Sequence, residues 1–160
     1  MFKLIKSKFN KIKPICVLSI FFLLSNISCE QNSSVRISSP NEIICFVLNT
    51  KNGKILYSIN QGKKNVISPS QLGIKFNNGV SLINNFKLLS INSKEVDETW
   101  EQPWGENKFV NNNYKESKIS LESKDNFKNK IDIIVRVYDD GVAFRYNVKK
   151  IRDLNKVVIT

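Results

Sequence analysis

The stretch NKIDIIVRVYDDGVAFRYNV, residues 129–148, decides the fold class. In its first half, every second residue from Ile131 to Val137 is isoleucine or valine, which is the period-two pattern of a β-strand. Asp139-Asp140-Gly141 then supplies a tight turn into a second strand, Val142–Val148, which is rich in aromatic and β-branched residues. The stretch therefore predicts an antiparallel β-hairpin.

The same pattern of short strands separated by glycine-containing turns recurs upstream. Asn52-Gly53 is the strongest short hairpin signal, and Gln61-Gly62 and Asn78-Gly79 are further turns. Residues 42–48 form an apolar run expected to be a strand buried on both faces, and residues 82–91 suggest a strand with a bulge. No convincing amphipathic helix is present. The sequence predicts an all-β fold, an antiparallel β-sandwich.

Two interruptions of this pattern are expected. Pro69 lacks a backbone N–H and should break the chain between strands at 64–68 and 71–76. An asparagine-rich segment should separate a strand at 109–114 from another at 118–122.

The N-terminus resembles an export signal. A lysine-rich leader precedes an apolar run, residues 15–24, that is shorter than the about 20 residues of a membrane span. Residues 1–28 are therefore predicted to be a signal peptide, of the lipoprotein type if Cys29 accepts the lipid. Asn26 departs from the aliphatic residue usual in such signals, and plain cleavage before Cys29 is the alternative. Residues 29–37 would then be a polar tether, and the chain would be anchored by lipid to a membrane of the periplasm or cell envelope.

Charge and composition exclude several functions. The formal net charge is +11, but five of the lysines precede the first apolar run, and the others are scattered, so no nucleic-acid partner is expected. The chain has no histidine, which excludes Ser-His-Asp and Cys-His catalysis and zinc sites that use histidine. Cys45 lies in an apolar run, where a buried, inert thiol is expected. No metal ligands are assigned.

Two long motifs resemble the N-terminal domain of glycoside hydrolase family 97. The first is Val96-Asp97-Glu98-Thr99-Trp100-Glu101 with Trp104-Gly105-Glu106, and the second runs from Val135 to Tyr146. Ser39-Pro40-Asn41 and residues 67–73 support them in the same order. The resemblance implies a mutarotase-like β-sandwich, followed in the family by a catalytic (β/α)₈ barrel. Family members hydrolyse α-glucosides or α-galactosides, with a calcium ion near the active site.

The resemblance assigns no catalytic residue and no metal ligand to this chain. The family's catalytic carboxylates lie in the barrel, and its N-terminal glutamate for calcium lies beyond the region represented here. Residues 38–160 are expected to be part of the sandwich, because the last apolar stretch, 157–160, coincides with the chain end. That stretch is either the edge strand of a complete small domain or a sign of a truncated chain.

The acidic, tryptophan-rich segment 96–106 is the candidate site. Pro103 and Gly105 are expected to prevent a regular element there. The side chains predicted to contact carbohydrate are Trp100, Glu101, Trp104 and Glu106, because indole faces stack on sugar rings and carboxylates accept hydrogen bonds from hydroxyl groups. The structural alternative is that the tryptophans fill the open end of the sandwich or its joint with the barrel, while the carboxylates cap turns or pair with lysines.

Three hypotheses about function remain at this stage. The chain is the non-catalytic N-terminal part of a family 97 glycosidase, supporting and walling the active site of a barrel that it lacks. Alternatively, it is a free-standing, lipid-anchored carbohydrate-binding module that contacts an α-linked oligosaccharide, or an inert remnant of a truncated gene. In each case, the chain alone is expected to be inactive as a hydrolase.

Overall fold

The computed structural model describes residues 32–76 and 79–151, and every regular element there is a β-strand. The signal peptide, Cys29, Asn78 and the stretch 157–160 lie outside the described residues. Within those residues, no helix is long and apolar enough to span a membrane. The strands are β1 (Ser33–Ser38), β2 (Ile44–Lys51), β3 (Lys54–Gln61), β4 (Lys64–Leu72), β5 (Ile74–Lys75), β6 (Ser81–Leu82), β7 (Phe86–Glu101), β8 (Phe109–Ser123), β9 (Lys130–Tyr138) and β10 (Val142–Val148).

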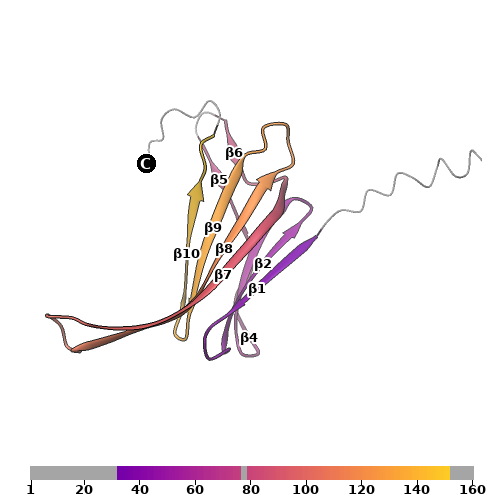
Figure 1. Ribbon diagram of the computed structural model, residues 1–160. Coiled ribbons are helices and arrows are strands. Elements are labelled where there is room, and N and C mark those ends of the chain that lie inside the picture. The colour runs from indigo at the N-terminus through magenta and orange to yellow at the C-terminus, as the bar shows by residue number, and fades with distance from the viewer. Residues whose placement is uncertain (1–31, 77–78, 152–160) are drawn as a thin grey trace, which may run out of the picture. The chain divides into compact units, whose positions relative to one another are not determined.

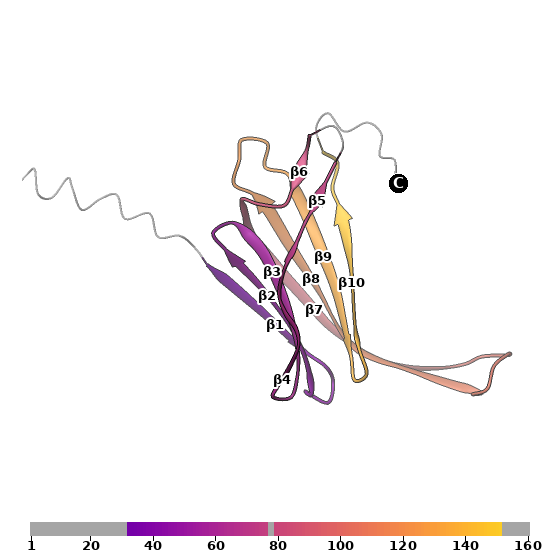
Figure 2. The same cartoon turned by 180° about the vertical axis from the view of Figure 1, so that it is seen from behind.

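The strands form two four-stranded antiparallel sheets and one small sheet. The first sheet has the order β1-β2-β3-β4, the second has the order β10-β9-β8-β7, and β5 pairs with β6. Both large sheets are simple meanders in which each strand pairs with its neighbours in sequence. Figures 1 and 2 show them as two layers, which confirms the predicted antiparallel β-sandwich.

The core lies between the two sheets and follows from the alternation in the sequence. In β9, residues 131, 133, 135 and 137 are fully buried, as the period-two pattern predicts. They pack in one cluster with Phe46 and Leu48 of β2, Ile55 of β3 and Phe86 at the start of β7. Phe46 also lies 5.9 Å from the ring of Tyr57. Cys45 is buried and unpaired, as expected for an inert thiol.

Two sequence expectations about strand limits are wrong. Pro69 does not break the chain: β4 continues through it, because β4 is an edge strand, where a missing N–H costs no ladder bond. The asparagine-rich segment does not interrupt β8 either. Asn111 and Asn112 bond to polar side chains of β7, so cross-strand pairs replace apolar alternation.

The expected tether and bulge can also be located. β1 takes up residues 33–37 of the range expected to be a tether, because Val35 and Ile37 point into the core while Ser34 and Arg36 remain exposed. The stretch 82–91, expected to be one strand, is divided, because Leu82 belongs to β6 and β7 begins only at Phe86. The expected bulge corresponds to the register shift between Leu88 and Ser90.

One hairpin extends beyond the sandwich. The pairing of β8 with β9 ends at Tyr114 and Tyr138, whereas the pairing of β7 with β8 continues to Glu101 and Phe109. We call this projecting part, residues 96–113, the ribbon; it leaves the other strands in both views (Figures 1 and 2). It contains the whole candidate site.

Candidate functional site

The candidate segment is half strand and half turn, so the expectation that Pro103 and Gly105 exclude a regular element there is only partly right. Residues 96–101 belong to β7 and pair with β8, and only residues 102–108 form the turn. The Gln102 backbone N–H donates to the Lys108 carbonyl at 3.0 Å, and the Gln102 side chain donates to the Asn107 carbonyl at 2.9 Å. Gly105 has a φ of 137°, and a Cβ there would collide with the Gln102 amide.

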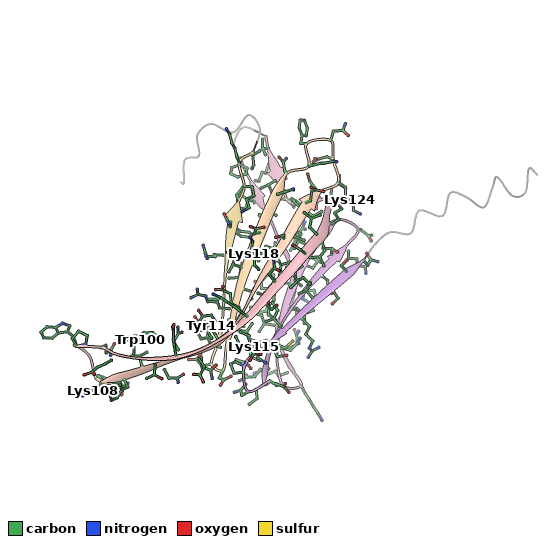
Figure 3. All side chains as sticks on the ribbon, viewed as in Figure 1. Trp100, Lys108, Tyr114, Lys115, Lys118 and Lys124 are labelled. Atoms are coloured by element: carbon green, nitrogen blue, oxygen red, sulfur yellow. The ribbon has the colours of Figure 1, made fainter. Side chains whose placement is uncertain are left out.

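Both tryptophans are exposed at the end of the ribbon. Trp100 is 46% exposed and Trp104 86% exposed, and Phe109, paired with Glu101, is 60% exposed. Figure 3 shows Trp100 and Lys108 far from the sandwich, with Tyr114 and Lys115 at the root of the ribbon. The tryptophans therefore do not fill the core or the open end of this sandwich, and that part of the structural alternative is wrong.

The carboxylates of the segment make few contacts with cations. Glu101 pairs with Lys108 at 3.3 Å, and the ammonium group of Lys108 lies 5.3 Å from the ring of Phe109. Glu98 accepts a hydrogen bond of 2.6 Å from Asn112. Glu106 is exposed and has no partner within the described residues. The four predicted carbohydrate-contacting residues thus share one end of the ribbon, and Glu101 alone among them pairs with a lysine, as the structural alternative expects.

On the outward face of the second sheet, by contrast, the carboxylates pair with lysine or arginine side chains. Glu116 contacts Arg136 at 2.6 Å and Lys94 at 3.2 Å, and hydrogen bonding from Arg136 holds the pKa of Glu116 below its usual value. The same contact raises the pKa of the Arg136 guanidinium, which also lies 4.7 Å from the ring of Tyr114. Arg136 is therefore a structural ion-pair partner.

Asp132 is the most buried of these carboxylates, with a side chain only 4% exposed. Burial alone would raise its pKa, but hydrogen bonds from Ser120, at 2.8 Å, and from two lysines outweigh burial and lower it. The lysines are Lys118, at 3.3 Å, and Lys149, at 3.1 Å. Glu122 is held in the same way, since a hydrogen bond from Lys87 lowers its pKa. These groups are charged at neutral pH and do not resemble a general acid.

Two hollows are lined by sandwich residues and not by the end of the ribbon, residues 100–109, which we call the tip. One of about 460 Å³ lies beside the root of the ribbon, between β1 and the β7–β8 hairpin. It is lined by polar side chains that include Arg36, Glu42, Glu95 and Lys115. Another, of about 370 Å³, is lined by residues of β9 and β10. The side chains of the tip are exposed, whereas glycoside hydrolysis needs two carboxylates held across an enclosed, bound sugar.

Calcium sites in proteins usually include several carboxylate ligands. Among residues 32–76 and 79–151, no three His, Cys, Asp or Glu side chains come close enough to hold a metal ion. No chemical step in this chain is therefore derived through calcium.

Sequence reasoning missed Phe109 and Lys108 as members of the tip. Lys108 is the last residue of the turn and Phe109 follows it, and both become neighbours of Glu101 only when β8 pairs with β7. The signal that could have revealed them is the polar register of the two strands, in which Asp97, Glu98 and Thr99 face an equally polar run, Asn111–Asn113.

Comparisons with known proteins agree on one family. The model of the glycosyl-hydrolase 97 N-terminal family matches residues 37–160. The retaining alpha-galactosidase of Bacteroides thetaiotaomicron is 24% identical over 124 residues, which are 78% of this chain and 18% of that protein.

Solved structures give the same result. A glycoside hydrolase family 97 enzyme from Pseudoalteromonas sp. strain K8, in complex with panose, superposes with a TM-score of 0.71 and 28% identity over 76% of this chain. A beta-arabinopyranosidase superposes with a TM-score of 0.65 and 27% identity over 72% of this chain. This chain covers only 18% of the length of either. The match over residues 37–160, the two-sheet sandwich and the order of the motifs lead to one conclusion: the chain belongs to the glycosyl-hydrolase 97 N-terminal family.

Proposed function

We propose that the chain serves as the non-catalytic N-terminal β-sandwich of a family 97 glycoside hydrolase that acts on α-glucosides or α-galactosides. In that role, it supports and walls the active site of a (β/α)₈ barrel. The observation that carries the proposal is the family match over residues 37–160, in a chain that spans 18% of the relatives' length. The paired carboxylates of the sheet and the exposed tip are consistent with support rather than with catalysis. Calcium and the catalytic carboxylates would come with the rest of such an enzyme.

A chimera tests this role. Residues 31–160 replace the matched N-terminal segment of the Pseudoalteromonas family 97 enzyme. We expect the chimera to hydrolyse a chromogenic α-glucoside with a kcat/KM within about tenfold of the parent, a barrier difference of about 1.4 kcal/mol. The 160-residue chain alone should show no hydrolysis. A folded but inactive chimera, or hydrolysis by the chain alone, would contradict the proposal.

Carbohydrate binding by the tip is a second candidate, favoured by the exposure of two indole rings beside carboxylates. Here the chain acts as a binding module, with Trp100, Glu101, Trp104 and Glu106 contacting an α-linked oligosaccharide. Tryptophan fluorescence of the 160-residue chain is titrated with maltooligosaccharides and with α-galactosides. A saturable shift lost in Trp104→Ala supports this function, and an unchanged spectrum at millimolar sugar rules it out.

We also propose export and lipid anchoring, on the sequence of residues 1–29 alone. Cys29 would carry the lipid and hold the domain at a membrane of the cell envelope. Mass spectrometry of the chain from a bacterial host should show diacylglycerol on Cys29, and Cys29→Ser should release the chain into the soluble fraction. An unlipidated wild-type chain would contradict anchoring.

A further inference from the structure

The ribbon lacks the support that the rest of the sheet has. Beyond Tyr114 and Tyr138 it consists of two strands only, so both of its edges are open and no third strand or second layer covers it within the described residues. A two-stranded hairpin is marginally stable in water by itself. Its geometry is therefore that of an arm that gains stability from a contact.

The ribbon also carries an exposed aromatic end. Trp100 faces Val110 across the hairpin and Val96 faces Tyr114, and the polar pair Glu98–Asn112 lies between them on the same face. Trp104 adds an exposed ring in the turn, and Phe109 adds one beside the turn, on the face opposite Trp100. Exposed aromatic side chains gathered at one end of a domain often mark a site of protein association.

The charges of the ribbon point to the chemistry of the partner. On the strands of the sandwich, Glu116, Glu122 and Asp132 each contact two cations. On the ribbon, Asp97 and Glu98 contact asparagines and no cation of the described residues. This occurs in a chain with 25 Lys and Arg against 14 Asp and Glu, so cations are not scarce. Carboxylates left without cations in a basic protein complement a partner that supplies them.

We infer that the ribbon is a docking arm, whose Trp100, Trp104 and Phe109 enter an apolar recess edged by Lys or Arg side chains. The recess belongs to the part of a family 97 enzyme that lies outside the matched N-terminal segment, so the inference rests on the proposed function. The match to only 18% of each relative leaves the greater part of those proteins available for this contact. A protein partner fits better than a saccharide, because a sugar supplies no cations and is usually bound in a concave site, whereas the rings of the tip are exposed.

The test compares ribbon variants in the chimera and in the 160-residue chain. Neutralising the ribbon with Asp97→Asn, Glu98→Gln and Glu106→Gln together should lower the melting temperature of the chimera by about 3–5 °C at low salt. The difference in melting temperature between this variant and the unchanged chimera should become smaller at 1 M salt, where charges are screened within about 3 Å. Trp104→Ala should lower the melting temperature of the chimera at both salt concentrations, because the substitution removes an apolar contact. In the 160-residue chain, these variants should leave the melting temperature unchanged.

Asp140→Asn is the matched control, since Asp140 is an exposed carboxylate off the ribbon, in the β9–β10 turn. This substitution should leave the melting temperature of the chimera unchanged. An active chimera that is insensitive to the ribbon variants overturns the docking arm and leaves the proposed function standing. A folded, inactive chimera that is still sensitive to them supports the arm and contradicts the proposed function. A chimera that does not fold overturns both, and saturable sugar binding lost in Trp104→Ala assigns the tip to a saccharide and overturns the arm.

Discussion

Glu42 has a left-handed backbone conformation, with a φ of 62°. The turn before β2 imposes it: the Glu42 N–H donates to the Ser39 carbonyl at 3.0 Å, and the Asn41 side chain accepts from the Ile43 N–H at 3.0 Å. For a side chain larger than glycine this conformation costs about 1–2 kcal/mol, whereas glycine loses about 0.4–1 kcal/mol through its freer unfolded state. We predict that Glu42→Gly stabilises the chain by about 0.5–1 kcal/mol in denaturant unfolding. Glu42→Ala, which keeps the strain, should give no such gain, and equal stability of the two variants would contradict the argument.

Gly53, in the Asn-Gly turn that the sequence predicts, is a position where replacing glycine should destabilise the domain. Its φ is 71°, and a Cβ would lie 2.8 Å from the Asn85 Cα, a backbone atom that cannot move aside cheaply. We predict that Gly53→Ala destabilises the domain by about 2–4 kcal/mol, since conformational strain and a backbone clash add. Gly62→Ala is the matched control, because Gly62 has a φ of 55° but open space around it, so strain alone should cost about 1 kcal/mol. Equal losses at the two glycines would refute the clash.

At the scale of elements, the sequence predicts strands well where apolar side chains alternate and poorly where strands are polar. The β9–β10 hairpin follows directly from alternation between residues 131 and 137, because one face is fully buried and the other, apart from Asp132, is only partly buried. The ribbon lacks such a buried face. Its strands are held by cross-strand pairs such as Asn112 with Glu98, which become visible only once the register is known.

This difference in support predicts a difference in dynamics along one hairpin. Amides of residues 97–100 and 110–112 should exchange with solvent on the order of 100-fold faster than those of 117–121, because only the latter lie between a third strand and a core. Hydrogen exchange of the 160-residue chain, followed by mass spectrometry, measures both regions at once. Uniform protection along β7 and β8 would show that the ribbon is stable without a partner.

At the scale of the molecule, the paired carboxylates of the second sheet link stability to pH. Arg136 lowers the pKa of Glu116, Lys87 lowers that of Glu122, and the partners of Asp132 lower its pKa despite burial. A folded-state pKa below the unfolded value stabilises the fold at pH above the ordinary carboxyl values of 4.5 and 3.8, and the gain is lost as the pH falls through the folded-state pKa.

We therefore predict that the unfolding midpoint in urea stays nearly constant from pH 7 to pH 5 and falls steadily from pH 5 to pH 2. Asp132→Asn should lower stability at pH 7, because it leaves Lys118 and Lys149 facing an uncharged group in a nearly buried position. The same variant should lose less stability than the wild-type chain between pH 7 and pH 2, because residue 132 then no longer takes up a proton as the chain unfolds. Asp140→Asn, which removes a carboxylate with no partner in the described residues, should leave the pH dependence as in the wild type. If Asp132→Asn and the wild-type chain lost the same stability between pH 7 and pH 2, the Asp132 ion pairs would not be a source of the acid sensitivity.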